Sequence, residues 1–283
     1  WVADYREGKG TFQYVNGDKY VGDWKADVQH GKGIYYFSSG DRYEGDYVEG
    51  ERTGQGIYVH KNGDKYVGEF KNGEQSGQGT FTWSTGAVYE GQWIDNVRSG
   101  KGHYKWANGD EYEGEWKNDK KNGQGVMVWP DQSKYEGQWK DDAREGQGTY
   151  LYAHGDKYTG DWVDDLQHGK GIYHFSNGDR YEGDYVSGGR TGNGIYYHAN
   201  GDKYVGGFKD GEQHGKGTFT WSSGAVYEGD WVNNVREGKG RYVWANGDEY
   251  DGDWVNGALS GTGTYTWKDG TVYTGGFSSN KFD

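Results

Sequence analysis

The sequence contains no cysteine, one proline (Pro130) and only three leucines (Leu151, Leu166 and Leu259). The missing cysteine excludes disulfides and thiolate metal sites, but it leaves both a cytosolic and an extracellular location open. No apolar run approaches the roughly 20 residues that a membrane-spanning helix requires, and nothing resembles a signal peptide. Because aliphatic residues are scarce, hydrophobic burial must come from aromatic rings, which make up 18% of the residues.

The charge balance is acidic, with a net charge of -13 over 283 residues. Nucleic acid and anionic lipid surfaces reward clustered lysine and arginine. The composition therefore disfavours a bare phosphate backbone or an anionic bilayer as the main partner, and it favours neutral or basic partners.

A repeat of 23 residues runs through the chain without insertion or deletion. The pattern Tyr-x-Gly begins at Tyr20, Tyr43, Tyr66, Tyr89, Tyr112, Tyr135, Tyr158, Tyr181, Tyr204, Tyr227, Tyr250 and Tyr273. A second pattern, Gly-x-Gly, keeps the same step from Gly8 to Gly263, and a third is the Asn-Gly-Asp segment seen at residues 16–18. Fixed self-similarity of this kind is typical of repeat architectures.

Each repeat shows the period of two that is typical of β-strands. Tyr89, Gly91 and Trp93 alternate with polar residues in one segment, and a second segment alternates from Gly100 to Trp106. We expect Asn-Gly-Asp segments to form tight hairpin turns and segments such as 94–99 (IDNVRS) to form longer polar loops. The prediction is an all-β fold: an elongated single-layer antiparallel β-meander of about twelve hairpin repeats, gently twisted and roughly 115 Å long at about 4.8 Å per strand.

Glycine shares one predicted strand face with the aromatic residues, although glycine weakens a strand by itself. We expect a ring from one strand to cover the bare backbone of its neighbour, which is a known way to stabilise glycine in a sheet. On this hypothesis, replacing Gly56 with valine destabilises the fold more than strand propensity alone predicts. The opposite face, with Glu44, Asp46 and Lys32, is expected to face solvent.

These residues resemble the MORN repeat (membrane occupation and recognition nexus). The segments YEGEWKNDKKNGQGVMVWPDQSK from Tyr112 and YVGEFKNGEQSGQGTFTWSTGAV from Tyr66 are similar to its pattern of tyrosine, glycine and tryptophan. The resemblance extends over essentially the whole chain and departs from the pattern at Met127 and Pro130. It implies a β-meander ribbon that scaffolds cytoskeletal, ciliary or membrane-junction assemblies or regulates lipid kinases or methyltransferases, in a cytoplasmic, cytoskeleton-associated location.

A longer period of six repeats is also present. Residues 43–102 and 181–240 are identical at 46 of 60 aligned positions. We interpret residues 1–283 as one continuous array in which a six-repeat block is duplicated, approximately as 20–157 and 158–283. Duplication of a gene segment explains the match, and the two blocks also suggest one partner-binding unit displayed twice.

The two ends of the array are expected to be open strand edges. Trp1 aligns with Trp24 in mid-repeat, and the chain ends shortly after a strand that contains Phe277. Open edges favour pairing with another strand. A longer parent protein or end-to-end self-association into a homo-oligomer is therefore a reasonable expectation.

Catalytic and metal sites are not indicated by any pattern in the sequence. Gly-x-Gly lacks the following helix that a nucleotide-binding loop needs, and carboxylates recur in every repeat, so none stands out as an acid or base. No histidine pair has metal-ligand spacing, because His30 and His168 fall at loop ends while His60 and His198 occupy aromatic positions. We predict a protein that is not an enzyme and that has no cofactor and no metal.

The ring-lined face is the candidate partner-binding surface, because a single-layer sheet cannot bury both faces. An extended peptide or a helix of a protein partner is the expected ligand. Two alternatives are a phospholipid or membrane-recruitment module, which the net charge disfavours, and a surface protein that binds carbohydrate or choline between rings. The predicted contact residues are Trp83, Trp93, Trp106, Trp116 and His60 in the first block, and Trp221, Trp231, Trp244, Trp254 and His198 in the second.

Overall fold

A computed structural model describes residues 4–283, which form 25 β-strands and no helix. Among these residues there is consequently no helix of the length and apolarity needed to cross a membrane. Trp1, which the sequence aligns with Trp24, lies outside the described residues. The chain divides into two compact units, of which the first ends at Ala143 and the second begins at Arg144.

The strands follow the repeat and alternate between two kinds. Even-numbered strands carry Tyr-x-Gly, and the odd-numbered strands from β1 to β23 carry Gly-x-Gly. The strands of the first unit are β1 (Gly8–Gln13), β2 (Lys19–Lys25), β3 (Val28–Tyr36), β4 (Arg42–Val48), β5 (Glu51–Val59), β6 (Lys65–Lys71), β7 (Glu74–Thr82), β8 (Val88–Ile94), β9 (Val97–Lys105), β10 (Glu111–Lys117), β11 (Lys120–Val128) and β12 (Lys134–Lys140).

The second unit repeats this arrangement. Its strands are β13 (Ala143–Leu151, from one residue before the boundary), β14 (Lys157–Val163), β15 (Leu166–His174), β16 (Arg180–Val186), β17 (Gly189–Tyr197), β18 (Lys203–Lys209), β19 (Glu212–Thr220), β20 (Val226–Val232), β21 (Val235–Val243), β22 (Glu249–Val255), β23 (Ala258–Thr266), β24 (Val272–Ser278) and β25 (Lys281–Phe282).

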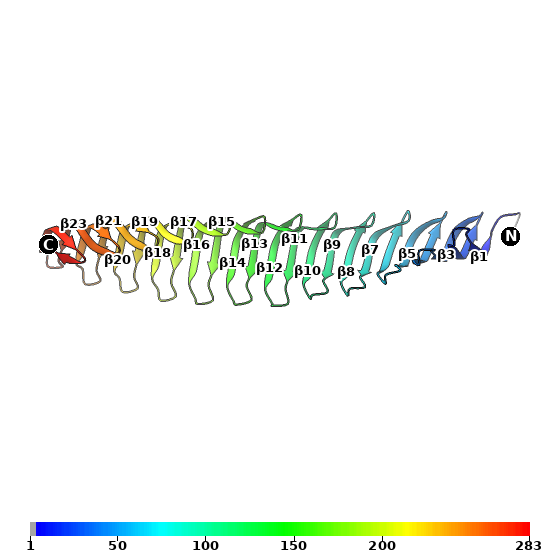
Figure 1. The fold of residues 1–283 in the computed structure, drawn as a ribbon, viewed down its shortest axis with the longest axis horizontal. Helices are drawn as coiled ribbons and strands as arrows, with labels where there is room; N and C mark the ends of the chain where they lie inside the picture. The colour runs from blue at the N-terminus through cyan, green and yellow to red at the C-terminus, as the bar shows by residue number, and fades with distance from the viewer. Residues whose placement is uncertain (1–3) are drawn as a thin grey trace. The chain divides into compact units, whose positions relative to one another are not determined.

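Within each unit, consecutive strands lie side by side in chain order and pair antiparallel, as a meander does (Figure 1). The prediction of an all-β antiparallel meander of hairpin repeats is therefore confirmed. The predicted length and twist of the ribbon stay predictions.

Tyrosine rings cover paired glycines, as the sequence predicts. Gly45 on β4 lies opposite Gly56 on β5. A Cβ atom on Gly45 would lie 2.3 Å from the Tyr43 hydroxyl oxygen, and one on Gly56 would lie 2.6 Å from the Tyr43 ring. Tyr43 itself is fully buried, and its hydroxyl donates to the Asp46 carbonyl oxygen at 3.1 Å. The glycines are therefore required by the close approach of the ring, and the ring-over-glycine prediction is confirmed.

The predicted turn lengths are wrong: the segments predicted as long loops form the short turns, and the Asn-Gly-Asp segments lie in the longer loops. Only Asp95 and Asn96 separate β8 from β9, and both have positive φ (48° and 67°), which is the conformation of a two-residue hairpin turn. The Asn-Gly-Asp segment belongs instead to the five-residue loop 14–18, in which the Gly17 N–H donates to the Tyr14 carbonyl at 3.0 Å. Asparagine and aspartate adopt positive φ without glycine more easily than other residues do, which is why the segment IDNVRS closes tightly.

A β-bulge follows each pair of covered glycines, and the period of two does not predict it. Gly45 pairs with Gly56 but the next residue, Asp46, pairs with Thr53, so that Gly54 and Gln55 have no partner on β4. Gly54 has a φ of 56°, and the Asp46 carboxylate accepts a hydrogen bond from the Gln55 N–H at 3.2 Å. The acidic residue after Tyr-x-Gly therefore has a structural task, which is to satisfy the extra backbone N–H of the bulge.

Candidate binding surface

Aromatic rings form a continuous row along one margin of the aromatic face in each unit, at the ends of the odd-numbered strands, and all are half-buried except Tyr104, which is buried. We call this row the ring ladder. In the first unit it consists of Phe12, Tyr14, Tyr35, Phe37, Tyr58, His60, Phe81, Trp83, Tyr104 and Trp106, with successive ring centroids between 4.3 and 5.9 Å apart. The second unit has the corresponding row from Tyr150 to Trp267. Neighbouring rings at these distances attract each other by about 0.5–1.5 kcal/mol beyond their area burial.

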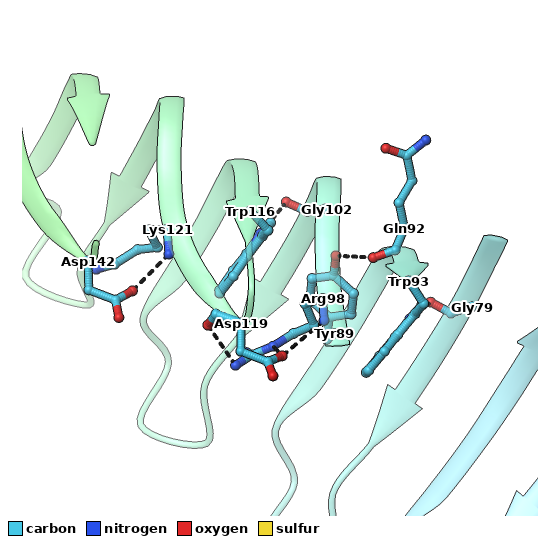
Figure 2. A network of polar contacts seen from close by, with 10 residues as sticks. All are labelled: Gly79, Tyr89, Gln92, Trp93, Arg98, Gly102, Trp116, Asp119, Lys121 and Asp142. Atoms are coloured by element: carbon cyan, nitrogen blue, oxygen red, sulfur yellow. Dashed lines mark hydrogen bonds and ion pairs between the residues drawn. The ribbon is translucent and has the colours of Figure 1, made fainter. Parts of the chain in front are cut away.

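Four of the predicted contact residues lie beneath the ladder and are buried. Trp93, Trp116, Trp231 and Trp254 are only 2–5% exposed. The indole N–H of Trp93 donates to the Gly79 carbonyl at 3.1 Å, and that of Trp116 donates to the Gly102 carbonyl at 3.2 Å (Figure 2). Each of these rings also packs edge-on against a buried tyrosine, as Trp93 does against Tyr89 at 5.2 Å. These four side chains hold consecutive repeats together.

The other six predicted contact residues belong to the ladder and are half-buried. His60, Trp83 and Trp106 alternate with Phe81 and Tyr104 in one uninterrupted stretch, and His198, Trp221 and Trp244 occupy the same places in the second unit. The fold thus brings three of the predicted residues together in each unit. Their exposed surfaces are available to a ligand.

Cationic side chains lie over the aromatic face, and the sequence analysis did not identify them. The Arg98 guanidinium carbon is 4.6 Å from the Trp116 ring centroid and 5.2 Å from that of Tyr104, while its Nε donates to Asp119 Oδ1 at 2.8 Å (Figure 2). A cation over a ring is stabilised by roughly 0.5–2 kcal/mol. The sequence feature that could have revealed these cationic side chains is an arginine at the same place in every second repeat. These arginines are Arg6, Arg52, Arg98, Arg144, Arg190 and Arg236.

Aspartates in seven of the five-residue loops link the loop to the next one, and this feature was also missed. The Asp18 carboxylate accepts hydrogen bonds from the Ser38 N–H at 2.7 Å and from the Tyr35 hydroxyl at 2.8 Å. We call this pair of contacts a turn tether. The N–H contact recurs at Asp18, Asp41, Asp64, Asp156, Asp179, Asp202 and Asp248. The signal in the sequence was the constant spacing of 17 residues between the aspartate and a ladder ring, which is tyrosine in five of the seven cases and phenylalanine after Asp64 and Asp202.

The hydrogen bonds of a tether stabilise the ionised form of its aspartate. Hydrogen bonds from the Ser38 N–H and, to a smaller extent, the Tyr35 hydroxyl lower the pKa of Asp18 to about 2. Burial raises the pKa of Tyr89 beneath the ladder to about 12, so its hydroxyl remains a neutral donor at physiological pH. Within residues 4–283 no group of three histidine, aspartate or glutamate side chains is arranged to hold a metal ion.

Solved structures give only weak similarities. The TCP domain of Drosophila melanogaster SAS-4, solved with a proline-rich motif of Ana2, is 13% identical over 55% of this chain and 85% of that chain, with a TM-score of 0.35. The TCP10 domain of Danio rerio CPAP, solved with a STIL peptide, is 10% identical over 95% and 99%, with a TM-score of 0.34. Virginiamycin B lyase from Staphylococcus aureus is 12% identical over 95% and 84%, with a TM-score of 0.16. Likenesses this low support no conclusion about the chain.

The family comparison is decisive. No curated protein sequence matches the chain. The model of the MORN repeat, in contrast, matches residues 1–19, 20–42, 43–65, 66–88, 89–111, 112–134, 135–157, 158–180, 181–203, 204–226, 227–249 and 250–272. These twelve matches are consecutive and use the same step as the Tyr-x-Gly pattern and the strands. The chain belongs to the MORN-repeat family.

Proposed function

We propose that the chain is a non-enzymatic repeat scaffold that binds partner proteins along the ring ladder. The partner contributes an extended peptide or a helix, and the setting is a cytoplasmic assembly of the cytoskeleton, the cilium or a membrane junction. The working contacts are His60, Trp83 and Trp106 in the first unit, with their equivalents His198, Trp221 and Trp244 in the second.

The half-buried state of these rings is the observation that supports the proposal. Trp83 is held between Phe81 and Tyr104, with ring centroids at 4.5 and 5.1 Å, and Trp106 packs on Tyr104 at 4.3 Å. A ring that is already fixed loses little conformational freedom when a ligand covers it. Exposed tryptophan and tyrosine side chains are also the types that most often dominate the energy of protein interfaces.

Tryptophan substitution tests the proposal. The full chain and a variant with Trp83, Trp106, Trp221 and Trp244 changed to alanine are used to capture proteins from a native lysate. The expected result is that a set of partners binds the unchanged chain and is lost from the variant. Circular dichroism and thermal melting first establish that both proteins remain folded, because each alanine removes ring contacts inside the ladder.

A matched control removes rings from the opposite face. Tyr36 and Tyr197 are half-buried and alternate with ladder residues along β3 and β17, so they point away from the ladder. Changing both to alanine is expected to leave capture intact. Equal capture by the tryptophan variant and the unchanged chain would reject the ladder as the binding surface. Both proteins are also tested for binding to anionic liposomes and to sugars and choline. If only the tryptophan variant fails to bind liposomes, a phospholipid is favoured as the ligand; if only that variant fails to bind sugars or choline, the carbohydrate or choline alternative is favoured.

A further inference from the structure

An alanine interrupts the row of turn tethers at the same place in both units and leaves a gap there. Ala87 stands where other loops have the tethering aspartate, and Ala225 does so in the second unit. The groups that such an aspartate would bind are still present. By the spacing found at Asp18, they are the Tyr104 hydroxyl with the Ala107 N–H, and the Tyr242 hydroxyl with the Ala245 N–H.

The loop backbone at the gap is that of a tethered loop. The Trp83 N–H donates to the Ala87 carbonyl at 2.9 Å, as the His60 N–H does to the Asp64 carbonyl at 2.8 Å. Gly86 has a φ of 93° and Gly63 one of 94°. The substitution has therefore removed the carboxylate and left its surroundings in place.

Two donors without a protein partner among the described residues face the gap. The Tyr104 side chain is only 9% exposed, and its hydroxyl has no hydrogen-bond partner among residues 4–283. The Ala107 N–H likewise has no partner in the described part of the chain, whereas the equivalent Ser38 N–H has Asp18. Ala107 and Ala245 are exposed and Tyr242 is half-buried, so these donors are accessible to a ligand from solvent.

The gap is also physically open. A Cβ atom placed on Gly63 would lie 3.6 Å from the Ser84 Cβ of the next loop, and on Gly201 it would lie 3.4 Å from that of Ser222. Above Gly86 and Gly224 the same position meets nothing within 4 Å. Consecutive loops are therefore less closely packed where the tether is missing, and space is left between them.

Aromatic rings and one arginine surround each gap, and in the first unit that arginine, Arg98, is also bound to Asp119. Trp83 and Trp106 lie on either side of Tyr104, with ring centroids at 5.1 and 4.3 Å. The Arg98 guanidinium carbon is 5.2 Å from the Tyr104 ring, and that of Arg236 is 5.4 Å from the Tyr242 ring. Hydrogen bonds of the same kind keep Asp18 ionised, as its pKa of about 2 indicates.

We propose that each gap is a carboxylate-binding site, which an aspartate or glutamate side chain of the partner's peptide segment fills. The Tyr104 hydroxyl and the Ala107 N–H donate to this carboxylate in the first unit, and Tyr242 and Ala245 do so in the second. Apolar residues next to the acid pack on the flanking tryptophans. This inference rests on the proposed function, because the segment is the one that the ring ladder binds, and it assigns that segment an acidic residue.

A peptide titration tests the inference without knowledge of the partner. The probes are acetyl-Val-Asp-Val-amide and the isosteric acetyl-Val-Asn-Val-amide, added to ¹⁵N-labelled full chain. The expected result is a saturable downfield shift of the Ala107 and Ala245 amide protons with the aspartate peptide only. Tyr104→Phe with Tyr242→Phe, which removes only two hydroxyl groups, is expected to weaken the binding about tenfold.

Filling the gaps from within gives the matched control. Ala87→Asp with Ala225→Asp supplies an internal carboxylate and is expected to abolish the response to the aspartate peptide. The inference is overturned if both peptides shift the two amides equally, if neither does, or if the filled variant still responds. These readouts do not depend on lysate capture. Failure of the tryptophan test therefore rejects the ring ladder, and failure of the titration rejects the acidic residue.

Discussion

At the scale of single residues, tyrosine and glycine act as one unit in this chain. The Tyr43 ring occupies the space where Gly45 and Gly56 would have side chains, and its hydroxyl satisfies the backbone carbonyl of Asp46. Because rings replace aliphatic side chains as the core, glycine provides the room that the core needs. The entropy that glycine loses on folding is offset by burial of the ring.

Replacing Gly56 with valine is expected to destabilise the first unit by about 3 kcal/mol or more. A Cβ atom there would lie 2.6 Å from the Tyr43 ring, so either the ring or the strand must move. Chemical denaturation measures the change. Gly189→Val is the control, because a Cβ at Gly189 meets only the Val186 carbonyl oxygen at 3.5 Å. If both valines had the same effect, strand propensity and not ring contact would explain the glycines.

The tether of Asp18 predicts a pH dependence of stability. The pKa of Asp18 is about 2 in the folded chain and about 3.9 in an unfolded one, so folding favours the ionised form. The contribution is complete above about pH 5 and is lost as the pH falls from about 4 to about 2. The difference in melting temperature between the unchanged chain and Asp18→Asn is therefore expected to narrow over this range. A difference that stays constant down to pH 2 would contradict the tether.

At the scale of the element, a carboxylate or amide caps the bulge of most hairpins, although Gly207 leaves the bulge between β18 and β19 without one. Asp46 accepts from the Gln55 N–H at 3.2 Å, and Gln92 does the same for the Lys101 N–H at 2.9 Å. Either side chain supplies the necessary acceptor. The requirement at this position is thus an oxygen at the right distance and not a negative charge.

Asp46→Ala is expected to lower the free energy of unfolding by about 1 kcal/mol, whereas Asp46→Asn is expected to leave it nearly unchanged. The alanine leaves the Gln55 N–H without an acceptor, and the asparagine retains one. Denaturation midpoints measure both. Lys32→Ala serves as a control for the ion pair between Lys32 Nζ and Asp46 Oδ1 at 2.6 Å, which is largely exposed and contributes little. Equal losses for asparagine and alanine would show that charge matters and capping does not.

The sequence predicts strands better than it predicts their connections. Alternation of rings and polar residues locates every hairpin, because burial of one face imposes a period of two. The two-residue turn at Asp95 and Asn96 was missed because glycine was taken as the marker of positive φ. The bulge at Gly54 was missed because its cap, Asp46, resembles any other polar residue of an exposed face.

The candidate surface was predictable in composition but not in burial. Trp93 and Trp83 are chemically identical, yet the register of β7 and β8 places the Trp93 indole N–H on the Gly79 carbonyl and leaves Trp83 half-exposed. Only pairing between strands decides which ring is covered. The tethers were invisible for a similar reason, since Asp18 and Tyr35 meet only when consecutive repeats are side by side.

At the scale of the whole molecule, stability is a sum over repeats and over the contacts between neighbours. Tethers strengthen these contacts at the loop margin, and in the described part of the chain they are absent at Ala87 and Ala225 as well as at Asp110, whose partner position is Pro130, and at Ser133. The steps at Ala87 and Ala225 are the ones where Trp83 and Trp106, or Trp221 and Trp244, are offered to a ligand. Local stability has therefore been reduced at the places where we propose that binding occurs, as is common at functional sites.

Ala87→Asp with Ala225→Asp is accordingly expected to stabilise each unit by about 1–3 kcal/mol, because each new carboxylate forms two hydrogen bonds to donors that otherwise have no protein partner within residues 4–283. Aspartate fits this place, since the equivalent Asp18 is only 9% exposed. Hydrogen exchange of the Ala107 and Ala245 amides should slow in the variant, while amides in the loop that contains Asp18 keep their rates. Asp64→Ala is the reverse control. The Ser84 N–H donates a hydrogen bond to the Asp64 carboxylate at 2.7 Å, so removing this carboxylate should accelerate hydrogen exchange of the Ser84 amide. Unchanged hydrogen exchange at the Ala107 and Ala245 amides would mean that an internal carboxylate cannot reach these donors. The interpretation of the gap as a missing tether would then be rejected.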